Sequence, residues 1–339
     1  MNGRLEDQNK IFRQCEEILA ELPRYVQEWY LSLRASDKSA TTCRVYINSI
    51  KQFLRFIDED YNVELSDINQ VVIMNYMVSI QTKNKDGQEL RTSDSYRCGI
   101  HAKLSSFIDF LYRNEYIEKD YMKFIEKPKN KDLARINENR VLLTEDDFQL
   151  ILDTARKGIP NQRNVGIQSL LRCRDISILL LFMFTGIREG ALVSMNVEDV
   201  DFVNNTISVI DKGEKRRTCY IPEKVSDELQ VWLIERKEIL DIMKKDTDAL
   251  FINYSGNRIS KVGIYQMVQR YTYHALGKAL SPHKLRAGLC SILYNETHDL
   301  EFVRRTIGHS DISTTQRYVV TDGMETYKSN LIMNKKINV

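Results

Sequence analysis

The sequence lacks paired cysteines, a large net charge and a long apolar run. Its six cysteines are scattered, without a CxxC pair or a spacing typical of metal ligands, which argues against a disulfide framework or a metal knuckle. Buried, reduced thiols in a reducing cytoplasm are the expected state. The chain has 49 basic and 47 acidic residues, which gives a net charge of only +2, so any nucleic-acid surface has to be a local basic patch.

Signals for secretion and membrane insertion are also missing. The N-terminal MNGRLEDQNK has no apolar signal core, and the longest apolar run, Ile176 to Phe184, is too short to span a bilayer. We therefore expect a cytoplasmic protein without membrane contact. With 339 residues, 42% of them apolar and 28% charged, the chain is long enough for two globular domains with separate cores.

Helical patterns dominate the first third of the chain. Residues 1–24 are expected to form an N-terminal extension, with an amphipathic helix that Pro23 interrupts. A second pattern after Ser39 predicts a helix with one apolar face that contains Tyr46, Ile50, Phe53 and Ile57. Another face is basic and either stays solvated or contacts phosphates; its residues are Arg44, Lys51 and Arg55.

Two further helices complete a predicted all-α domain over residues 25–127. Asp67 is expected to cap a helix with the apolar residues Val71, Met74, Met77 and Val78. The polar stretch 83–90 indicates a loop. The next helix is predicted from Ser93 to Asn114, with a core side made of Leu104, Phe107, Ile108 and Leu111.

The composition then changes. Residues 128–141 are polar and basic, with little apolar periodicity, which is typical of a linker. The lysines in and before this stretch are Lys123, Lys127, Lys129 and Lys131. These lysines either keep the linker solvated or contact DNA that is wrapped between two domains.

The second half begins with a predicted helical core. Thr144 and Asp147 resemble a helix N-terminal cap, which precedes the apolar residues Phe148, Ile151 and Leu152. A strongly apolar helix ends at Thr185, and Gly186 occupies the position where glycine commonly ends helices. This buried helix is expected to deliver Arg188 to a fixed point.

A small antiparallel sheet interrupts the helices. The predicted strands are Val200–Val203, Thr206–Ile210 and Thr218–Ile221. Basic residues gather at the second turn, near Gly213, where a hairpin tip can touch phosphates or enter a groove. These residues are Lys212, Lys215, Arg216 and Arg217.

A helix with two polar side chains on one face follows this sheet and two more helices. Ser281-Pro282 is a typical helix start, so His283 and Arg286 lie three residues apart and point the same way. Taken alone, such a pair is more often structural than catalytic. Its surroundings decide between these two readings.

The last part of the chain adds a histidine and a tyrosine. Asp299 is expected to cap a helix that ends at Gly308, directly before His309. A further helix starts near Ser313 and carries Tyr318. The tail has apolar residues at helical spacing, namely Met324, Tyr327, Leu331 and Ile332.

Together these residues fit the transfer of a DNA phosphodiester. Two arginine forks can bind both non-bridging oxygens of a phosphate under in-line attack. A tyrosine hydroxyl, with a reference pKa of about 10, needs a nearby base or cationic field, which the histidines and arginines supply. A hairpin lysine such as Lys212 can protonate the leaving 5′-hydroxyl, so the reaction requires no metal and no cofactor.

The chain resembles the tyrosine recombinases of the phage integrase family, which include the Xer, Cre and lambda-integrase types. TGIREGAL is similar to the motif of the first arginine, IDKGEKRRTCYIP to the lysine hairpin, HKLR to the histidine and second arginine, and GHSDISTTQRY to the third motif. The resemblance implies that the catalytic residues are Arg188, Lys212, His283, Arg286, His309 and the nucleophile Tyr318. Ala191 departs from the acidic residue usual at its position, and HKLRAG departs from the commoner HxLRH.

The resemblance also implies a fold and an assembly. The fold is mainly α with a small antiparallel β-sheet, in which a helical, SAM-like core-binding domain (25–127) precedes an α+β catalytic domain (142–322). The tail, 323–339, either docks on a neighbouring protomer or packs on its own domain. A homotetramer on two double-stranded DNA sites would act through a 3′-phosphotyrosine and a Holliday junction, without ATP, at the bacterial nucleoid.

Two other functions fit parts of the sequence. One is a catalytically silent DNA-binding or architectural protein of the same fold, which the complete set of six candidate catalytic residues argues against. The other is a type IB topoisomerase activity, which shares this chemistry but fits the domain order less well. The target DNA sequence and the outcome, whether integration, excision, inversion or dimer resolution, do not follow from these residues.

Overall fold

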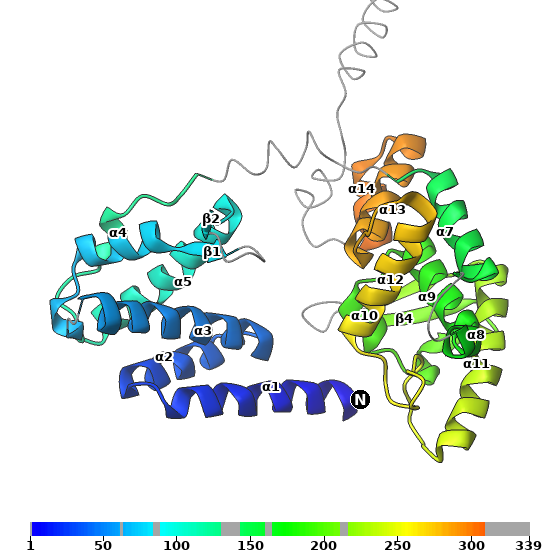
Figure 1. The fold of residues 1–339 in the computed structure, drawn as a ribbon, viewed down its shortest axis with the longest axis horizontal. Coiled ribbons are helices and arrows are strands. Elements are labelled where there is room, and N and C mark those ends of the chain that lie inside the picture. The colour runs from blue at the N-terminus through cyan, green and yellow to red at the C-terminus, as the bar shows by residue number, and fades with distance from the viewer. Residues whose placement is uncertain are drawn as a thin grey trace, which may run out of the picture. The chain divides into compact units, whose positions relative to one another are not determined.

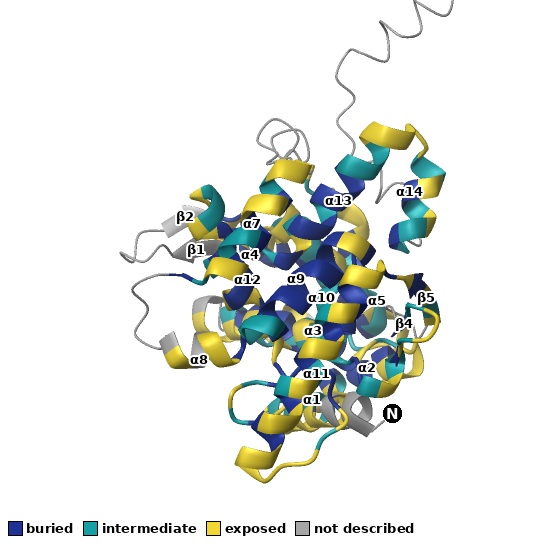
Figure 2. Cartoon of the chain, turned by 90° about the vertical axis from the view of Figure 1, so that its right-hand side faces the viewer, coloured by how far each residue is buried: buried dark blue, intermediate teal, exposed yellow. Residues whose placement is uncertain are grey.

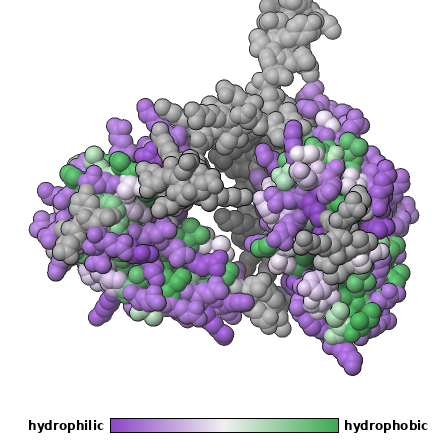
Figure 3. Space-filling model, viewed as in Figure 1, coloured by the Kyte–Doolittle hydropathy of each residue, from purple (hydrophilic) through white to green (hydrophobic). Residues whose placement is uncertain are grey.

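The structure, a computed structural model, describes residues 2–61, 64–83, 89–129, 143–159, 165–210 and 216–308. Helices contain most of these residues, and the chain divides into two compact units, Met1–Asn139 and Arg140–Val339 (Figure 1). On the face shown in Figure 3, hydrophilic residues predominate on both units and apolar residues form smaller separate areas. Within the described ranges no helix is long and apolar enough to cross a membrane.

The N-terminal unit is built from helices around one apolar core. Trp29 is fully buried in this core, and its ring centroid lies 5.1 Å from that of Phe107. The helices are α1 (Asn2–Ala20), α2 (Arg24–Ala35), α3 (Ala40–Phe56), α4 (Gln70–Ser79) and α5 (Asp94–Arg113), with the short turns η1 (Ile57–Tyr61), η2 (Leu65–Asp67) and η3 (Tyr121–Phe124).

Several predicted helices of this unit are confirmed. Ser39 and Ser93 cap α3 and α5 through their hydroxyl groups, which accept hydrogen bonds from backbone N–H groups three residues further on. The predicted core side of α5 is buried along its length. Helix α1 contacts α3 and buries Cys15 and Leu19. Apolar periodicity therefore identified these helices and their inner faces.

The predicted start and inner face of α4 are wrong. Asn69, not Asp67, caps the helix, and its side-chain oxygen accepts from the backbone N–H of Val71 at 2.9 Å. Asp67 instead ends the turn η2. The buried residues are Val72, Ile73, Tyr76 and Met77, whereas Val71, Met74 and Val78 are exposed. The sequence QVVIMNYMVS is apolar on most sides, so periodicity cannot select the inner face.

The predicted all-α character of this unit also needs correction. The two ends of the stretch predicted as a loop, 83–90, overlap the strands β1 (Gln81–Lys83) and β2 (Glu89–Arg91), which pair antiparallel. Residues 84–88 between them lie outside the described residues. Each strand has only three residues, which is shorter than the stretch over which alternation of apolar and polar side chains predicts a strand. The signal for a strand is therefore absent from the sequence.

The C-terminal unit surrounds one buried helix with other helices and a small sheet. This central helix is α9 (Arg172–Thr185), which is buried over most of its length in Figure 2 and contacts at least four other helices. The other helices are α7 (Glu145–Lys157), α8 (Val165–Leu170), α10 (Glu189–Val193), α11 (Glu223–Met243), α12 (Lys261–Leu276), α13 (Pro282–Thr297) and α14 (Leu300–Ile307), with the turn η4 (Val197–Asp199). The predicted cap of α7 is confirmed as a capping box of Thr144 and Asp147.

The sheet of this unit is antiparallel, as predicted. Its strands, in the order β3-β4-β5, are β3 (Val200–Asp201), β4 (Thr206–Ile210) and β5 (Arg216–Tyr220). Ile207 and Val209 of β4 are fully buried. Strand β5 starts at Arg216 instead of the predicted Thr218, because Ile210 pairs with Arg216 and Val209 with Arg217. Two of the basic residues assigned to the turn thus belong to the strand.

Candidate active site

The turn that follows α9 places Arg188. Gly186 ends the helix with φ of 56°, a left-handed conformation that favours glycine, and its N–H donates to the carbonyl of Phe182 at 3.1 Å. Arg188 is then the N-cap residue of α10. Its Nη2 donates to the carbonyl of Gly308 at 3.0 Å. The central helix therefore carries this arginine to the C-terminal end of α14.

Arg286 is anchored on the same turn. Ser281 is the N-cap of α13 and Pro282 its first residue, as predicted, although the Ser281 side chain makes no capping hydrogen bond. Arg286 is only 2% exposed, and its Nη1 donates to the carbonyl of Gly186. A buried guanidinium is tolerated where carbonyls or anions compensate its charge. Of the two arginines predicted to bind phosphate, Arg188 thus lies at one end of the short segment Gly186–Arg188, and Arg286 donates to the carbonyl at its other end.

His283 lies in the electrostatic field of both arginines. Although His283 is exposed as a whole residue, the protein around its imidazole displaces water and lowers its pKa below the ordinary value of 6.5, and the positive charges of Arg286, Lys284 and Arg188 lower the pKa further. The imidazole is therefore neutral at neutral pH. A neutral imidazole has one nitrogen that can accept a proton, which suits a general base.

The C-terminal end of α14 receives guanidinium groups from two directions. The carbonyl of Thr306 accepts from Nη1 of Arg217 at 2.7 Å, and the carbonyl of Gly308 accepts from Arg188. Carbonyls at a helix C-terminus lack intrahelical partners and carry the negative end of the helix dipole, so cations stabilise them. His309 is the next residue in the chain. The strand that follows the lysine hairpin, the first arginine and the start of the third motif therefore meet at this end.

Helix α14 itself follows the sequence prediction. Asp299 caps it, with a side-chain oxygen that accepts from the N–H groups of Glu301 and Phe302 at 2.8 and 2.9 Å. Val303 and Ile307 are buried in a small cluster with Cys290 of α13. Gly308 ends the helix in a left-handed conformation.

Four of the predicted site residues lie outside the described residues. They are Lys212, Lys215, His309 and Tyr318. The tail 323–339 and most of the linker 128–141 also lie outside them. The geometry of the site is thus defined around Arg188, His283 and Arg286.

Residues 142–323 match the model of the phage integrase family. The chain belongs to this family. It is 29% identical over 297 residues to tyrosine recombinase XerC of Thermodesulfovibrio yellowstonii, and the match covers 86% of this chain and 89% of the relative. It is 27% identical over 298 residues to tyrosine recombinase XerD of Staphylococcus epidermidis, over 86% of this chain and 92% of the relative. The protein is thus a tyrosine recombinase.

Solved structures agree on the fold of this recombinase. XerH bound to difH substrate in a pre-cleavage complex has a TM-score of 0.68 and 21% identity, over 97% of this chain and 90% of that chain. A lambda integrase dimer bound to a COC′ core site has a TM-score of 0.61 and 17% identity, over 87% and 93%. The predicted two-domain tyrosine recombinase fold, mainly α with a small antiparallel sheet, is confirmed.

The recombinase departs from the sequence pattern usual in its family at Ala191, which is 5% exposed. The neighbouring acid, Glu189, has a buried Oε1 without a hydrogen-bond partner among the described residues. Burial raises the pKa of its carboxyl, and the nearby charge of Lys261 opposes this rise. Glu189 is therefore poorly suited to replace a solvated carboxylate next to Arg188.

Two sets of contacts that support the site carry no sequence signal. Arg258 donates to the carbonyls of Val193 and Met195 at 3.0 and 2.8 Å, at the end of the helix that Arg188 begins. Asp175, inside α9, accepts from its neighbour Arg174 at 2.6 Å and from the Tyr271 hydroxyl of α12 at 3.0 Å. The partners are up to 96 residues apart in the chain, so no local motif reveals them.

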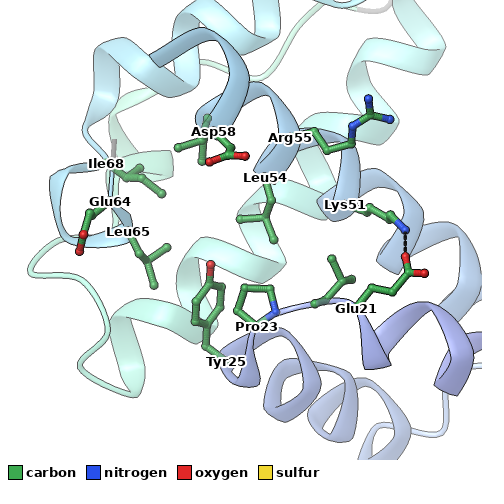
Figure 4. Close-up of a pocket in the computed structure, with 12 residues that line it drawn as sticks. Glu21, Pro23, Tyr25, Lys51, Leu54, Arg55, Asp58, Glu64, Leu65 and Ile68 are labelled. Atoms are coloured by element: carbon green, nitrogen blue, oxygen red, sulfur yellow. Dashed lines mark hydrogen bonds and ion pairs between the residues drawn. The ribbon is translucent and has the colours of Figure 1, made fainter. Parts of the chain in front are cut away.

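The predicted DNA-binding residues of α3 all have partners within the N-terminal unit. Arg44 donates to Gln14 of α1 at 2.7 Å, and Lys51 forms an ion pair with Glu21 at 2.6 Å. Arg55 pairs with Glu59 at 3.1 Å. Lys51 and Arg55 also line a pocket of about 580 Å³ together with acidic and apolar side chains, including Glu21, Asp58, Glu64, Leu54 and Leu65 (Figure 4). At least two of the three basic residues therefore help to dock α1 on α3.

The other candidate DNA contacts differ in exposure. Lys127 and Lys129 are exposed, and so is Arg216 at the start of β5. Arg217, the next residue, is half-buried and bonds to α14. The sequence gives no reason to separate these two arginines, whereas the structure does.

Proposed function

We propose that this tyrosine recombinase cuts and rejoins double-stranded DNA at specific sites, with Tyr318 as the nucleophile. The observation that supports this most is the convergence of Arg188, His283 and Arg286 around the turn after α9. Two guanidinium forks match the non-bridging oxygens of one phosphate, and a neutral imidazole beside them can accept a proton.

In the proposed reaction, the hydroxyl oxygen of Tyr318 attacks the phosphorus and the bond from phosphorus to the 5′ oxygen breaks. The tyrosine proton passes to a neighbouring base, for which His283 is suited and which His309 can assist. Lys212 gives a proton to the leaving 5′ oxygen. The free 5′-hydroxyl of the partner strand then attacks the 3′-phosphotyrosine, which releases Tyr318. The proton of that hydroxyl returns to Lys212, and the base returns its proton to Tyr318. Because the phosphotyrosine ester keeps the free energy of the broken phosphodiester bond, the cycle balances without ATP.

Arg188 and Arg286 stabilise the negative charge that develops on the phosphate. By analogy with the loss of oxyanion-hole donors, removal of either raises the barrier by about 3 kcal/mol. Arg286 is suited to this role because burial keeps its side chain in one place. Chemistry by cationic side chains needs neither a metal nor a cofactor, which is part of this proposal.

The assembly is proposed by analogy with proteins of similar fold. Those structures include XerH on difH substrate before and after cleavage, a lambda integrase dimer on a core site, and the Tn1549 integrase with circular intermediate DNA. We propose that four protomers bind two DNA sites and exchange one strand pair. A Holliday junction then forms, and the second strand pair is exchanged.

The parts of the chain divide this work. We propose that residues 25–127 grip DNA as the core-binding domain and that 128–141 link them to the catalytic domain, 142–322. The exposed Lys127, Lys129 and Arg216 are the best placed of the basic candidates to touch phosphates. The tail, 323–339, docks on a neighbouring protomer, and residues 1–24 extend the first domain.

A suicide DNA substrate tests the proposed chemistry. It carries a nick beside the cleavage position, so that loss of a short fragment prevents rejoining and a covalent protein–DNA complex accumulates. Any inverted repeats found beside the gene are the candidate sites to test. We expect Tyr318→Phe to abolish the complex and Tyr254→Phe, at a tyrosine that is 53% exposed, to retain it.

Each alternative predicts its own outcome, in this assay or in a parallel assay with supercoiled plasmid DNA. A complex that still forms with Tyr318→Phe contradicts the assignment of the nucleophile. Tight binding to the site without cleavage by the wild type favours a silent DNA-binding protein. Relaxation of supercoiled DNA without the joining of two sites favours a type IB topoisomerase activity.

A further inference from the structure

We infer that Arg217 is a positioning residue that ties strand β5, at the base of the lysine hairpin, to α14, a role that rests on the proposed function of Lys212. The half-buried guanidinium of Arg217 donates through Nη1 to the carbonyl of Thr306 at 2.7 Å. Thr306 lies in the last turn of α14, two residues before Gly308, whose carbonyl accepts from Arg188. One short helix end thus binds both the hairpin strand and the first arginine.

The contact acts at the base of the hairpin. Val209 pairs with Arg217 and Ile210 with Arg216, and these are the last described pairs before the tip. On the β4 side, Val209 is fully buried, so the core fixes that strand. On the β5 side, the bond from Arg217 to Thr306 ties the strand to α14. Lys212 is five residues from Arg217 in the sequence, so the position of this base limits where the lysine can lie.

The two neighbouring arginines of β5 have different roles on this view. Successive side chains of a strand point to opposite faces, and Arg216 is exposed whereas Arg217 faces α14. Arg216 is therefore available to a DNA phosphate. Arg217 uses its charge on the carbonyls of a helix C-terminus, where a cation is favourable.

Loss of the contact is expected to slow one chemical step. Without Arg217, strand β5 is free to move away from α14, and Lys212 is less often aligned with the 5′ oxygen. A misplacement of about 1 Å can cost roughly 100-fold in rate. We expect Arg217→Ala to slow cleavage at saturating DNA by about 10- to 100-fold, with little change in DNA affinity.

A substrate with sulfur in place of the bridging 5′ oxygen separates positioning of the lysine from a general loss of structure. A thiol has a reference pKa of about 8.5, far below that of an alcohol, so its thiolate leaves without a proton donor. We expect the sulfur substrate to restore most of the cleavage rate of Arg217→Ala, and of Lys212→Ala, toward the wild-type rate. Thr218→Ala, at an exposed position on the same strand, is the matched control and is expected to cleave both substrates normally.

Four outcomes overturn the inference. An equal loss by Arg217→Ala on both substrates shows that the residue does not act through the proton donor. A loss of affinity with unchanged cleavage at saturating DNA, the pattern expected for Arg216→Ala, makes Arg217 a DNA contact. If the sulfur substrate restores the cleavage rate of Lys212→Ala but not that of Arg217→Ala, the role of Arg217 is refuted and that of Lys212 stands. If Lys212→Ala cleaves the oxygen substrate at the normal rate, the proposed role of the lysine is refuted as well.

Folding of the variant is checked within the same experiment. Cleavage of the sulfur substrate itself requires a folded site, so recovered cleavage excludes global unfolding. If Arg217→Ala does not fold, Arg217→Lys makes the same comparison, because lysine keeps the charge but lacks the rigid fork. Its cleavage of the oxygen substrate is then expected to be slowed and to recover on sulfur.

Discussion

The substitution Gly288→Ala tests how closely α13, the helix of His283 and Arg286, must approach its neighbours. A Cβ added at Gly288 would lie 2.8 Å from the Cβ of Leu143 and 3.1 Å from two ring carbons of Phe148. The Cβ of Leu143 is attached directly to the backbone, so it cannot turn away as the tip of a long side chain can. Either α13 or the start of α7 has to shift.

The expected magnitude follows from two opposing effects. Overpacking of a core costs about 1–3 kcal/mol, and contact with two neighbours places this site near the upper end. Replacement of glycine by alanine inside a helix returns about 1 kcal/mol. The net loss is then about 2 kcal/mol, which corresponds to a melting temperature lower by roughly 4–8 °C for a unit of about 200 residues.

The assay compares thermal unfolding of the full chain with that of a matched glycine variant. Gly263, in α12 of the same unit, has room for a Cβ, with no atom closer than 3.4 Å. We expect Gly263→Ala to leave the melting temperature unchanged or to raise it. If Gly288→Ala also melts at or above the wild-type temperature, close packing of α13 does not require glycine at this position, and the reasoning is refuted.

Four further outcomes are expected. Because the pKa of His283 is lowered, the pH at which cleavage at saturating DNA is half-maximal, as the imidazole gains a proton, should lie below about 6.5, the ordinary value; His283→Gln should lower the rate and remove this fall, and a half-maximal rate at or above that pH contradicts the neutral base. Arg286→Lys keeps the charge but loses the fork, so we expect cleavage to drop by about 100-fold or more without a matching loss of DNA affinity. Asp175→Asn breaks a buried ionic network and is expected to destabilise by about 3 kcal/mol in denaturant unfolding, whereas Asp153→Asn, on the surface, changes stability by less than about 0.5 kcal/mol. Deletion of residues 323–339 is expected to impair recombination more than DNA binding, and an equal loss of both contradicts a role of the tail in assembly.

Local chemistry made much of the fold predictable. Capping side chains at Ser39, Thr144 and Asp299, and the left-handed Gly186, act within one helical turn, so the sequence around them contains the whole signal. The start of α4 was mispredicted for a related reason. Asp67 and Asn69 are both good caps, and nothing local decides between them.

The contacts that build the site were less predictable, because they join distant parts of the chain. Arg188 and Gly308 are 120 residues apart, and Arg217 and Thr306 are 89 apart. Every residue has a backbone carbonyl, so the residue type does not indicate which carbonyl accepts a hydrogen bond from an arginine. Motifs identified the arginines as candidates for DNA chemistry, but only the folded chain shows that Arg217 is already used by α14.

The C-terminal end of α14 also connects the proposed phosphate site with the segment that follows this helix. Arg286 is buried and bonds to the end of the central helix, so its position depends on the core. Helix α14 has only eight residues, too few to be stable alone, and its position depends on its packing against α13 and on bonds from Arg188 and Arg217. In the proposed reaction Arg188 binds the DNA phosphate, and the same guanidinium contacts the carbonyl that precedes His309. Occupation of the phosphate site is therefore linked, through one side chain, to the segment that leads to Tyr318.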